Sequence, residues 1–374
     1  MKDSATDFSP GLPWRRGLES FGAALVVIAL TLAYFAPHLG TLMEPSPGTF
    51  EWDRALGFLR QCANPWAPDV EAALRWRLLP PTVAYWLGLR GIGALALPWL
   101  GVVALLTQLH WMLRRAGLGR AACLATMVLV AGSGGALTSM HWLGINDGWY
   151  LMGLVTVTLS RGLRSLVVAC LLCVWIDERF IVGLPLALLC RTLTAPDLPN
   201  PASFAILFKR LWHVSWPAAA AVLPYALIRV SLSVGDDDLS NGWFLHRVAR
   251  EFVNWAPYAP LGWWMGLRAA WAPLVTGLRD VSILRGTPAA LLCLLTTAAT
   301  LALSLVLASD LSRTTILLLP GILCGAISLA QSSSGERVLL VAAAANLLIP
   351  AMHVSYSHGE PIYYLPLELW RLWN

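Results

Sequence analysis

Long apolar runs, separated by short polar breaks, fill most of this chain. Several of the runs approach the ~20 residues that an α-helix needs to cross the hydrocarbon core of a membrane. In lipid, every backbone polar group has to be hydrogen-bonded within its own segment, and a helix achieves this. The pattern therefore predicts an all-α polytopic membrane protein.

We predict about eleven membrane spans from the lengths of these runs. They cover residues 17–36, 92–113, 121–139, 148–160, 165–176, 180–190, 211–229, 260–277, 287–309, 314–331 and 338–354. Short loops rich in arginine stay in the cytoplasm. Arg15 and Arg16 precede the first span, and Arg114 and Arg115 follow the second. The N-terminus is therefore expected inside and the C-terminus outside.

The first long hydrophilic interruption, residues 38–77, follows the first span and is expected outside. Two short amphipathic helices are predicted in this loop, lying at the membrane interface. The next apolar segment, 79–90, is too short to cross alone, so we expect a re-entrant or interfacial piece on the outer side. A second outer loop is expected at 230–259. No soluble domain is predicted, and residues 1–374 form a single transmembrane domain in this interpretation.

Composition narrows the class of partner. The chain is 57% hydrophobic and 13% charged, with a mean hydropathy of +0.64. The net charge of +5 is not accompanied by a basic run or a nucleic-acid-binding motif, so membrane lipid rather than nucleic acid is the expected partner. Cys170 and Cys173 have the spacing of a redox pair, but they lie within a predicted span, and packing is their expected role.

Carboxylates and arginines gather at the predicted outer face, several of them beside the end of a span. The candidate substrate-binding residues are Arg54, Arg77, Asp147, Asp177, Glu178, Arg179, Asp310 and Arg313. Ionisable groups in the membrane are costly unless they face a cavity or a partner. A carboxylate can accept the proton of an acceptor hydroxyl while arginines neutralise a phosphate leaving group. The alternative is structural, because carboxylates cap helices and arginines snorkel or pair with them.

Three further features carry weaker signals. Arg268 falls in the middle of the span 260–277, and an intramembrane arginine is a functional candidate by default. Asp236-Asp237-Asp238 has the clustered carboxylates that bind a divalent cation, although a solvated loop tip is the favoured interpretation. No spacing typical of a zinc site, a phosphate-binding loop or a nucleophile elbow is present. No cofactor is therefore required, and a divalent metal ion is the one that the sequence leaves open.

An acidic tripeptide of the ExD pattern, Glu51-Trp52-Asp53, lies in the first outer loop. In this position, and with many spans and interfacial helices around it, the chain resembles the GT-C superfamily of polytopic glycosyltransferases, which use polyprenyl-phosphate sugars. The resemblance implies that Asp53 is the general base and that Glu51 is its support or a metal ligand. It also implies that the phosphate contacts come from Arg54, Arg77 or Arg179.

The leading hypothesis is a glycosyltransferase-like enzyme of the bacterial inner membrane. It would move a sugar from a lipid-linked polyprenyl-phosphate donor to an acceptor at the outer face. One alternative is a transporter or flippase of a lipid-linked or anionic solute, for which Arg268 is the sequence feature. The other alternative is a non-catalytic membrane scaffold, which would lack a cavity beneath the first outer loop.

Overall fold

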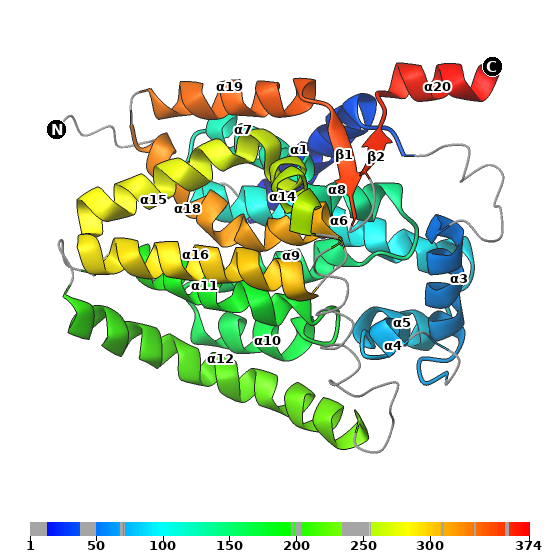
Figure 1. The fold of residues 1–374 in the computed structure, drawn as a ribbon, viewed down its shortest axis with the longest axis horizontal. Helices are drawn as coiled ribbons and strands as arrows, with labels where there is room; N and C mark the ends of the chain where they lie inside the picture. Colours follow the sequence, from blue (N-terminus) through cyan, green and yellow to red (C-terminus); the bar gives the residue numbers. More distant parts are fainter. Residues whose placement is uncertain are drawn as a thin grey trace.

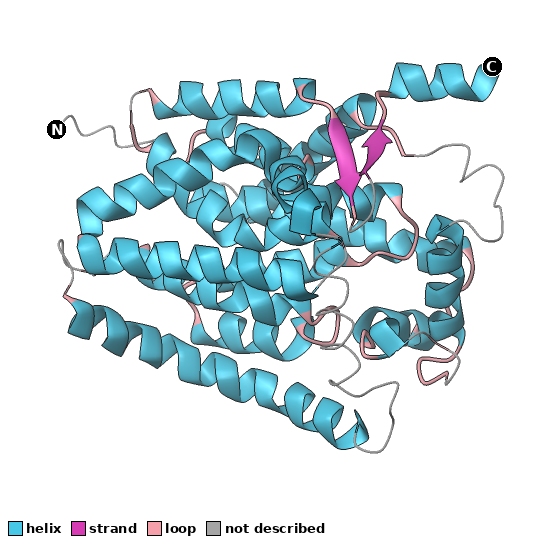
Figure 2. Cartoon of the chain, viewed as in Figure 1, coloured by secondary structure: helices cyan, strands magenta, loops and turns pink. Residues whose placement is uncertain are grey.

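The chain folds into a bundle of helices with a single small sheet (Figures 1 and 2). The structure is a computed structural model that describes residues 13–37, 50–67, 70, 72–195, 198, 203–233, 254, 256–307, 310–332, 334–355 and 359–374. The expectation of a mainly helical protein is confirmed for these residues. The all-α class needs one correction, because strands β1 (Ala351–Val354) and β2 (Gly359–Ile362) pair antiparallel near the C-terminus.

The elements follow one another along the chain with few long connections among the described residues. The first half contains α1 (Pro13–Tyr34), α3 (Phe50–Ala63), α4 (Ala72–Arg75), α5 (Leu79–Trp86), α6 (Ile92–Arg115), α7 (Arg120–Ala131), α8 (Gly134–His141), α9 (Asp147–Leu159), α10 (Leu163–Cys173), α11 (Arg179–Leu193) and α12 (Phe204–Ser233). The second half contains η2 (Ala256–Tyr258), α14 (Ala259–Leu267), η3 (Arg268–Ala270), α15 (Trp271–Arg285), α16 (Thr287–Leu307), α17 (Leu311–Thr314), η4 (Thr315–Leu318), α18 (Leu319–Ala330), α19 (Gly335–Leu348) and α20 (Leu365–Trp373).

Membrane-length helices account for part of the predicted span pattern. Among the described residues, five helices are long and apolar enough to cross a membrane: α1, α6, α12, α16 and the stretch from α17 to α18. The bent pair α7 and α8 raises the number to six. The prediction of eleven spans is not confirmed. Helices α9, α10 and α11 have only 13, 11 and 15 residues, because polar breaks interrupt their apolar runs.

Three of the predicted spans do not form continuous straight helices. The run 121–139 bends by 67° between α7 and α8, where Gly132 and Ser133 interrupt the helix. The run 260–277 breaks at Arg268, whose φ of 47° is incompatible with a right-handed helix. The run 338–354 ends at Leu348, shortly before Pro350, which lacks the N–H of a continuing helix. Its last residues form β1 instead.

Arg268 joins these three irregular points. Its side chain is fully buried and donates hydrogen bonds from Nη1 to the Ile349 carbonyl oxygen at 3.1 Å and from Nη2 to the Gly132 carbonyl oxygen. The guanidinium carbon lies 4.4 Å from the centre of the Phe35 ring. Helix ends leave backbone carbonyls without intrahelical partners, and a buried guanidinium satisfies two of them here. The mid-span arginine is therefore a connector between helix ends.

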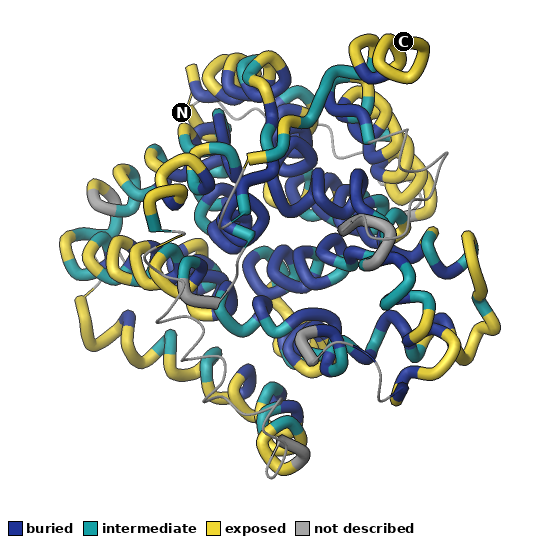
Figure 3. Tube along the Cα trace, turned by 45° about the vertical axis from the view of Figure 1, so that its right-hand side comes forward, coloured by how far each residue is buried: buried dark blue, intermediate teal, exposed yellow. Residues whose placement is uncertain are grey.

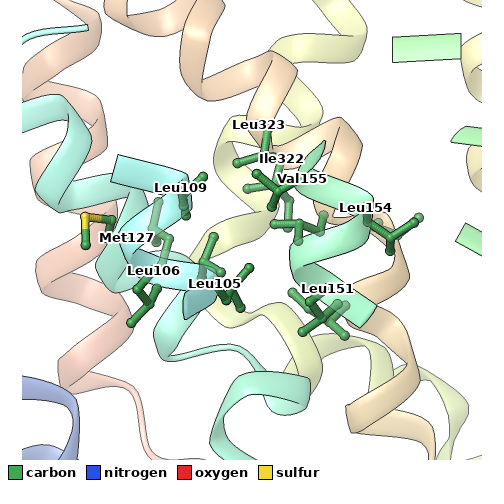
Figure 4. Close-up of a cluster of buried hydrophobic side chains, with 14 of the residues drawn as sticks. Leu105, Leu106, Leu109, Met127, Leu151, Leu154, Val155, Ile322 and Leu323 are labelled. Atoms are coloured by element: carbon green, nitrogen blue, oxygen red, sulfur yellow. The ribbon is translucent and has the colours of Figure 1, made fainter. Parts of the chain in front are cut away.

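The apolar core lies where α6, α7, α9 and α18 meet (Figure 4). Leu105 and Leu109 of α6 lie beside Val155 of α9 and Ile322 of α18 in this cluster. Buried residues concentrate in these inner helices, while exposed residues line the outermost ones (Figure 3). Gly148 is needed for this packing, since a Cβ there would lie 2.5 Å from the Gly101 carbonyl carbon. The start of α9 is thereby fixed against α6.

The first predicted outer loop contains the short helices that the sequence indicated. Helix α3 lies across the direction of α12 and α16 at one end of the molecule, with α4 and α5 beside it (Figure 1). Within the segment 79–90, Pro80, Pro81 and Ala84 are buried, whereas 80% of Trp86 is exposed. The interfacial or re-entrant character of this segment stays a prediction. Residues 38–49 and 234–253, which make up much of the two predicted outer loops, lie outside the described residues.

Replacement of Arg268 by methionine tests its role as a connector. Arg268→Met leaves the carbonyls of Gly132 and Ile349 buried without a donor, at a cost of about 1–3 kcal/mol for each orphaned group. We expect a lower free energy of unfolding in detergent micelles. The matched control is Arg337→Met on the exposed side of α19, which is expected to change stability little. Equal stability of the two variants would contradict the assignment.

Candidate functional site

Most of the predicted substrate-binding residues meet in one ion-pair network. Its members are Arg77, Asp147, Asp177, Glu178, Arg179, Asp310 and Arg313. They come from segments that lie far apart in the sequence. The pattern of charges at predicted span ends did therefore identify residues that converge in space.

Helix starts bring these residues together. Asp147 is the first residue of α9, Arg179 is the first residue of α11, and Asp310 is the N-cap of α17. The Asp310 carboxylate accepts a hydrogen bond from the Arg313 backbone N–H at 3.2 Å. Negative charge is favoured at a helix N-terminus by the unpaired N–H groups and the helix dipole. The capping interpretation is thus correct for Asp310, and the same residue also pairs with a side chain.

Asp147 is the centre of the network. Its Oδ2 atom lies 2.5 Å from Nε of Arg313, and its Oδ1 atom accepts from Nη2 of Arg313 at 2.6 Å and from Nη2 of Arg179 at 2.9 Å. The side-chain exposures are 1% for Asp147, 7% for Arg313 and 5% for Arg179. A buried carboxylate with two guanidinium partners is ionised and held in one orientation. Asp147 therefore positions two arginines.

Asp177 forms the second half of the network. Its carboxylate accepts from Nε and Nη2 of Arg179 at 2.8 and 2.6 Å, and Nη1 of Arg77 lies 3.2 Å away. Burial alone would raise the pKa of Asp177, but the charges of Arg179 and Arg77 outweigh it and hold the pKa well below its usual range. Burial likewise opposes the charge on Arg77, yet Asp177 and Glu178 raise the pKa of Arg77 above its ordinary value.

The edge of the network is more accessible and includes a residue that the sequence did not indicate. Glu178 is 30% exposed and accepts from Nη2 of Arg77 at 3.1 Å. Nε2 of His353 lies 3.5 Å from Oδ1 of Asp310, and the His353 ring lies 3.9 Å from the Trp142 ring. His353 sits in β1, within a run that reads as a membrane span. A lone histidine in an apolar run carries no signal of such a contact.

A cleft of about 360 Å³ adjoins the network beneath α3. Arg54 and Phe58 of α3 line it from one side, and Arg77, Asp177 and Arg313 line it from the other. Asn146 also lines the cleft, and its buried Oδ1 atom has no hydrogen-bond partner among the described residues. Three arginines thus face a space that holds no protein atom.

The two predicted catalytic residues, Glu51 and Asp53, belong to α3, but their side chains lie outside the described residues. Their backbone positions can still be compared. Helix positions three, four and seven apart share a face. Position 51 therefore lies on the face of Arg54 and Phe58, which line the cleft, whereas position 53 lies on the face of exposed Arg60.

The other sequence candidates lie away from the cleft or cannot be placed. Arg268 does not line the cleft, and its contacts are those of a connector. Cys170 and Cys173 are buried free thiols, in agreement with a packing role. Among the described residues, no group of three His, Cys, Asp or Glu side chains is arranged to hold a metal ion. Asp236, Asp237 and Asp238 lie outside the described residues.

Comparison of the chain with protein-family models, with curated proteins and with solved structures finds no match. The residues and the geometry of the cleft are therefore the basis for a function.

Neutralisation of Asp147 tests the network. Asp147→Asn leaves Arg313 and Arg179 buried with a weaker partner, and breaking a buried ion pair costs about 3 kcal/mol or more. We expect a loss of that order in the free energy of unfolding in micelles. The control is Glu19→Gln, which breaks the exposed pair of Glu19 and Arg120 at 3.0 Å and is expected to cost less than about 1 kcal/mol. Similar losses for both variants would refute a special role for Asp147.

The depressed pKa of Asp177 predicts a pH-dependent contribution to stability. The unfolded carboxyl has a pKa of about 3.9. Because the folded pKa lies lower, the stabilisation is fully present above about pH 5 and is lost as the pH falls below about 4. The difference in unfolding free energy between the native chain and Asp177→Asn is therefore expected to shrink as the pH falls to about 2. Denaturation at a series of pH values measures it, and a constant difference would contradict the prediction.

Proposed function

We propose that this protein is an integral membrane glycosyltransferase-like enzyme. It transfers a sugar from a polyprenyl-phosphate donor to a hydroxyl acceptor, with the site at the outer face of the bacterial inner membrane. The observation that carries the proposal is the cleft beneath α3, lined by Arg54, Arg77 and Arg313. The long apolar helices are compatible with access to a lipid-linked substrate.

The arginines support the binding of a phosphate group. A guanidinium donates several hydrogen bonds in a fixed geometry that matches phosphate oxygens. Arg313 and Arg77 are already held in place by Asp147, Asp177 and Glu178, so little order has to be gained when a ligand binds. In the proposed reaction they neutralise the charge on the departing polyprenyl phosphate.

The general base is expected on α3, because the carboxylates inside the network are unsuited to the task. A carboxylate bound by two guanidinium groups has a low affinity for a proton. Asp147 and Asp177 are both of this kind. The helical register places position 51 on the cleft face, so we assign the base to Glu51 and a supporting role to Asp53.

The proposed step is a direct displacement. The acceptor oxygen bonds to the anomeric carbon while the bond between that carbon and the phosphate oxygen breaks. The electron pair leaves with polyprenyl phosphate, and the acceptor proton moves to Glu51. Attack from the side opposite the leaving group inverts the anomeric centre. A divalent cation could assist the phosphate, and Glu51 would then be a candidate ligand.

Paired substitutions in α3 test this assignment. We expect Glu51→Gln to lower the rate of sugar transfer from a labelled polyprenyl-phosphate sugar by about 100-fold or more, which is the usual contribution of a general base. Asp53→Asn is expected to retain most of the rate. Arg60→Gln, on the exposed face of the same helix, is the matched control. Turnover is measured in membranes that contain equal amounts of each variant.

The outcomes separate the competing functions. Loss of turnover in Asp53→Asn alone would return the base to Asp53 and leave the enzyme class standing. Unchanged turnover in Glu51→Gln, Asp53→Asn and Arg77→Gln would refute the transferase. The buried, carbonyl-bound state of Arg268 offers no support for a transporter based on that residue. The cleft beneath the first predicted outer loop, which a plain scaffold does not require, favours a site.

A further inference from the structure

A second cavity lies between α11, α15, α16 and α18, with an empty volume of about 860 Å³ that includes its open mouth. It shares no lining residue with the cleft beneath α3. On α11, Arg179 is the first residue and belongs to the ion-pair network, whereas Cys190 lies near the helix end and lines this cavity. At 1.5 Å per residue the two are roughly 16 Å apart along the helix axis. The second cavity therefore lies toward the opposite end of the bundle.

The lining changes from apolar to polar toward the helix ends. Leu186 and Leu274 lie in the interior of α11 and α15 and line the inner part. Thr194 and Gln331 directly follow the last residues of α11 and α18 and line the mouth. A cavity with an apolar interior and a polar mouth suits an amphiphile, whose chain lies inside and whose head group faces water.

The mouth carries both signs of charge on one helix. Asp280 and Arg285 of α15 both line the cavity. The Ser328 hydroxyl donates a hydrogen bond to Asp280, and Nη1 of Arg285 donates to the Leu198 carbonyl oxygen at 2.7 Å. Burial lowers the pKa of Arg285, and the nearby charge of Arg210 lowers it further. A ligand anion beside Arg285 would relieve this repulsion, and a ligand cation would be drawn to Asp280.

A hydroxyl group without a partner marks the cavity wall. Thr297 of α16 is only 6% exposed and lines the cavity. Its Oγ1 atom has no hydrogen-bond partner among the described residues. A buried hydroxyl without a partner costs free energy, and an ester carbonyl of a ligand would satisfy it.

We propose that this cavity binds one zwitterionic phospholipid with a primary ammonium head group, such as phosphatidylethanolamine. The phosphate lies against Arg285, the ammonium group is bound by Asp280, and one acyl chain fills the space along Leu186 and Leu274. The Thr297 hydroxyl donates to an ester carbonyl. The site is separate from the proposed transferase cleft and does not depend on it.

The cavity contains its own reporter, because Cys324 lines it and is partly exposed. The full chain is placed in nanodiscs of phosphatidylglycerol alone or of phosphatidylglycerol with an equal share of phosphatidylethanolamine. We expect phosphatidylethanolamine to slow the reaction of Cys324 with N-ethylmaleimide by about tenfold, which corresponds to a preference of about 1.4 kcal/mol. Peptide mapping by mass spectrometry gives the rate at Cys324.

Variants assign the effect to the proposed contacts. Asp280→Asn is expected to abolish the slowing, since the ammonium group loses its counter-charge. Glu336→Gln, an exposed carboxylate in the first turn of α19, is the matched control and is expected to keep it. If Asp280→Asn does not fold, Thr297→Val takes its place and is expected to weaken the slowing about threefold through the lost hydrogen bond. Equal rates in the two lipid mixtures, or slowing that survives both substitutions, would overturn the proposal.

Discussion

The carboxylate of Asp147 and its two arginines constrain the whole outer end of this bundle. A buried charge is tolerated only when oppositely charged groups and hydrogen bonds replace the lost water. Arg179 and Arg313 supply these contacts, and they belong to α11 and α17, so the starts of three helices have to meet at one place. Gly148 makes the meeting possible because α9 can then contact the backbone of α6. The packing of α6, α9 and α11 follows from these contacts.

The same network separates two chemical roles that look alike in the sequence. Carboxylates held by guanidinium groups orient those groups and are poor proton acceptors. Arg77 and Arg313 reach from the network to the cleft, whereas the two carboxylates of the ExD motif belong to a helix that lies over it. This division of roles is the basis of the proposed transferase chemistry. It also explains why the network can be structurally essential and still serve a ligand.

Irregular backbone is the second organising feature. A break in a helix at membrane depth leaves carbonyls without partners, and such breaks persist only where protein groups satisfy them. Arg268 does this for the breaks beside Gly132 and Ile349. The residue that sequence reasoning assigned to solute transport is thereby explained by the breaks themselves. Six of the predicted spans match long or bent helices, and the shorter ones depend on neighbours that cover their ends.

The sequence by itself determined the helical class, the short helices of the first outer loop and most members of the charged network. These features are local, because apolar run length and charges beside helix ends can be read directly from the chain. Only the tertiary structure decided that Asp147 and Asp177 are bound by arginines, that His353 contacts Asp310, and that Arg268 joins helix breaks. Contacts between residues more than 100 positions apart depend on how helices pack, and no local pattern specifies that packing. The hydrophilic loop became a site candidate only when α3 was found over a cleft lined with arginines.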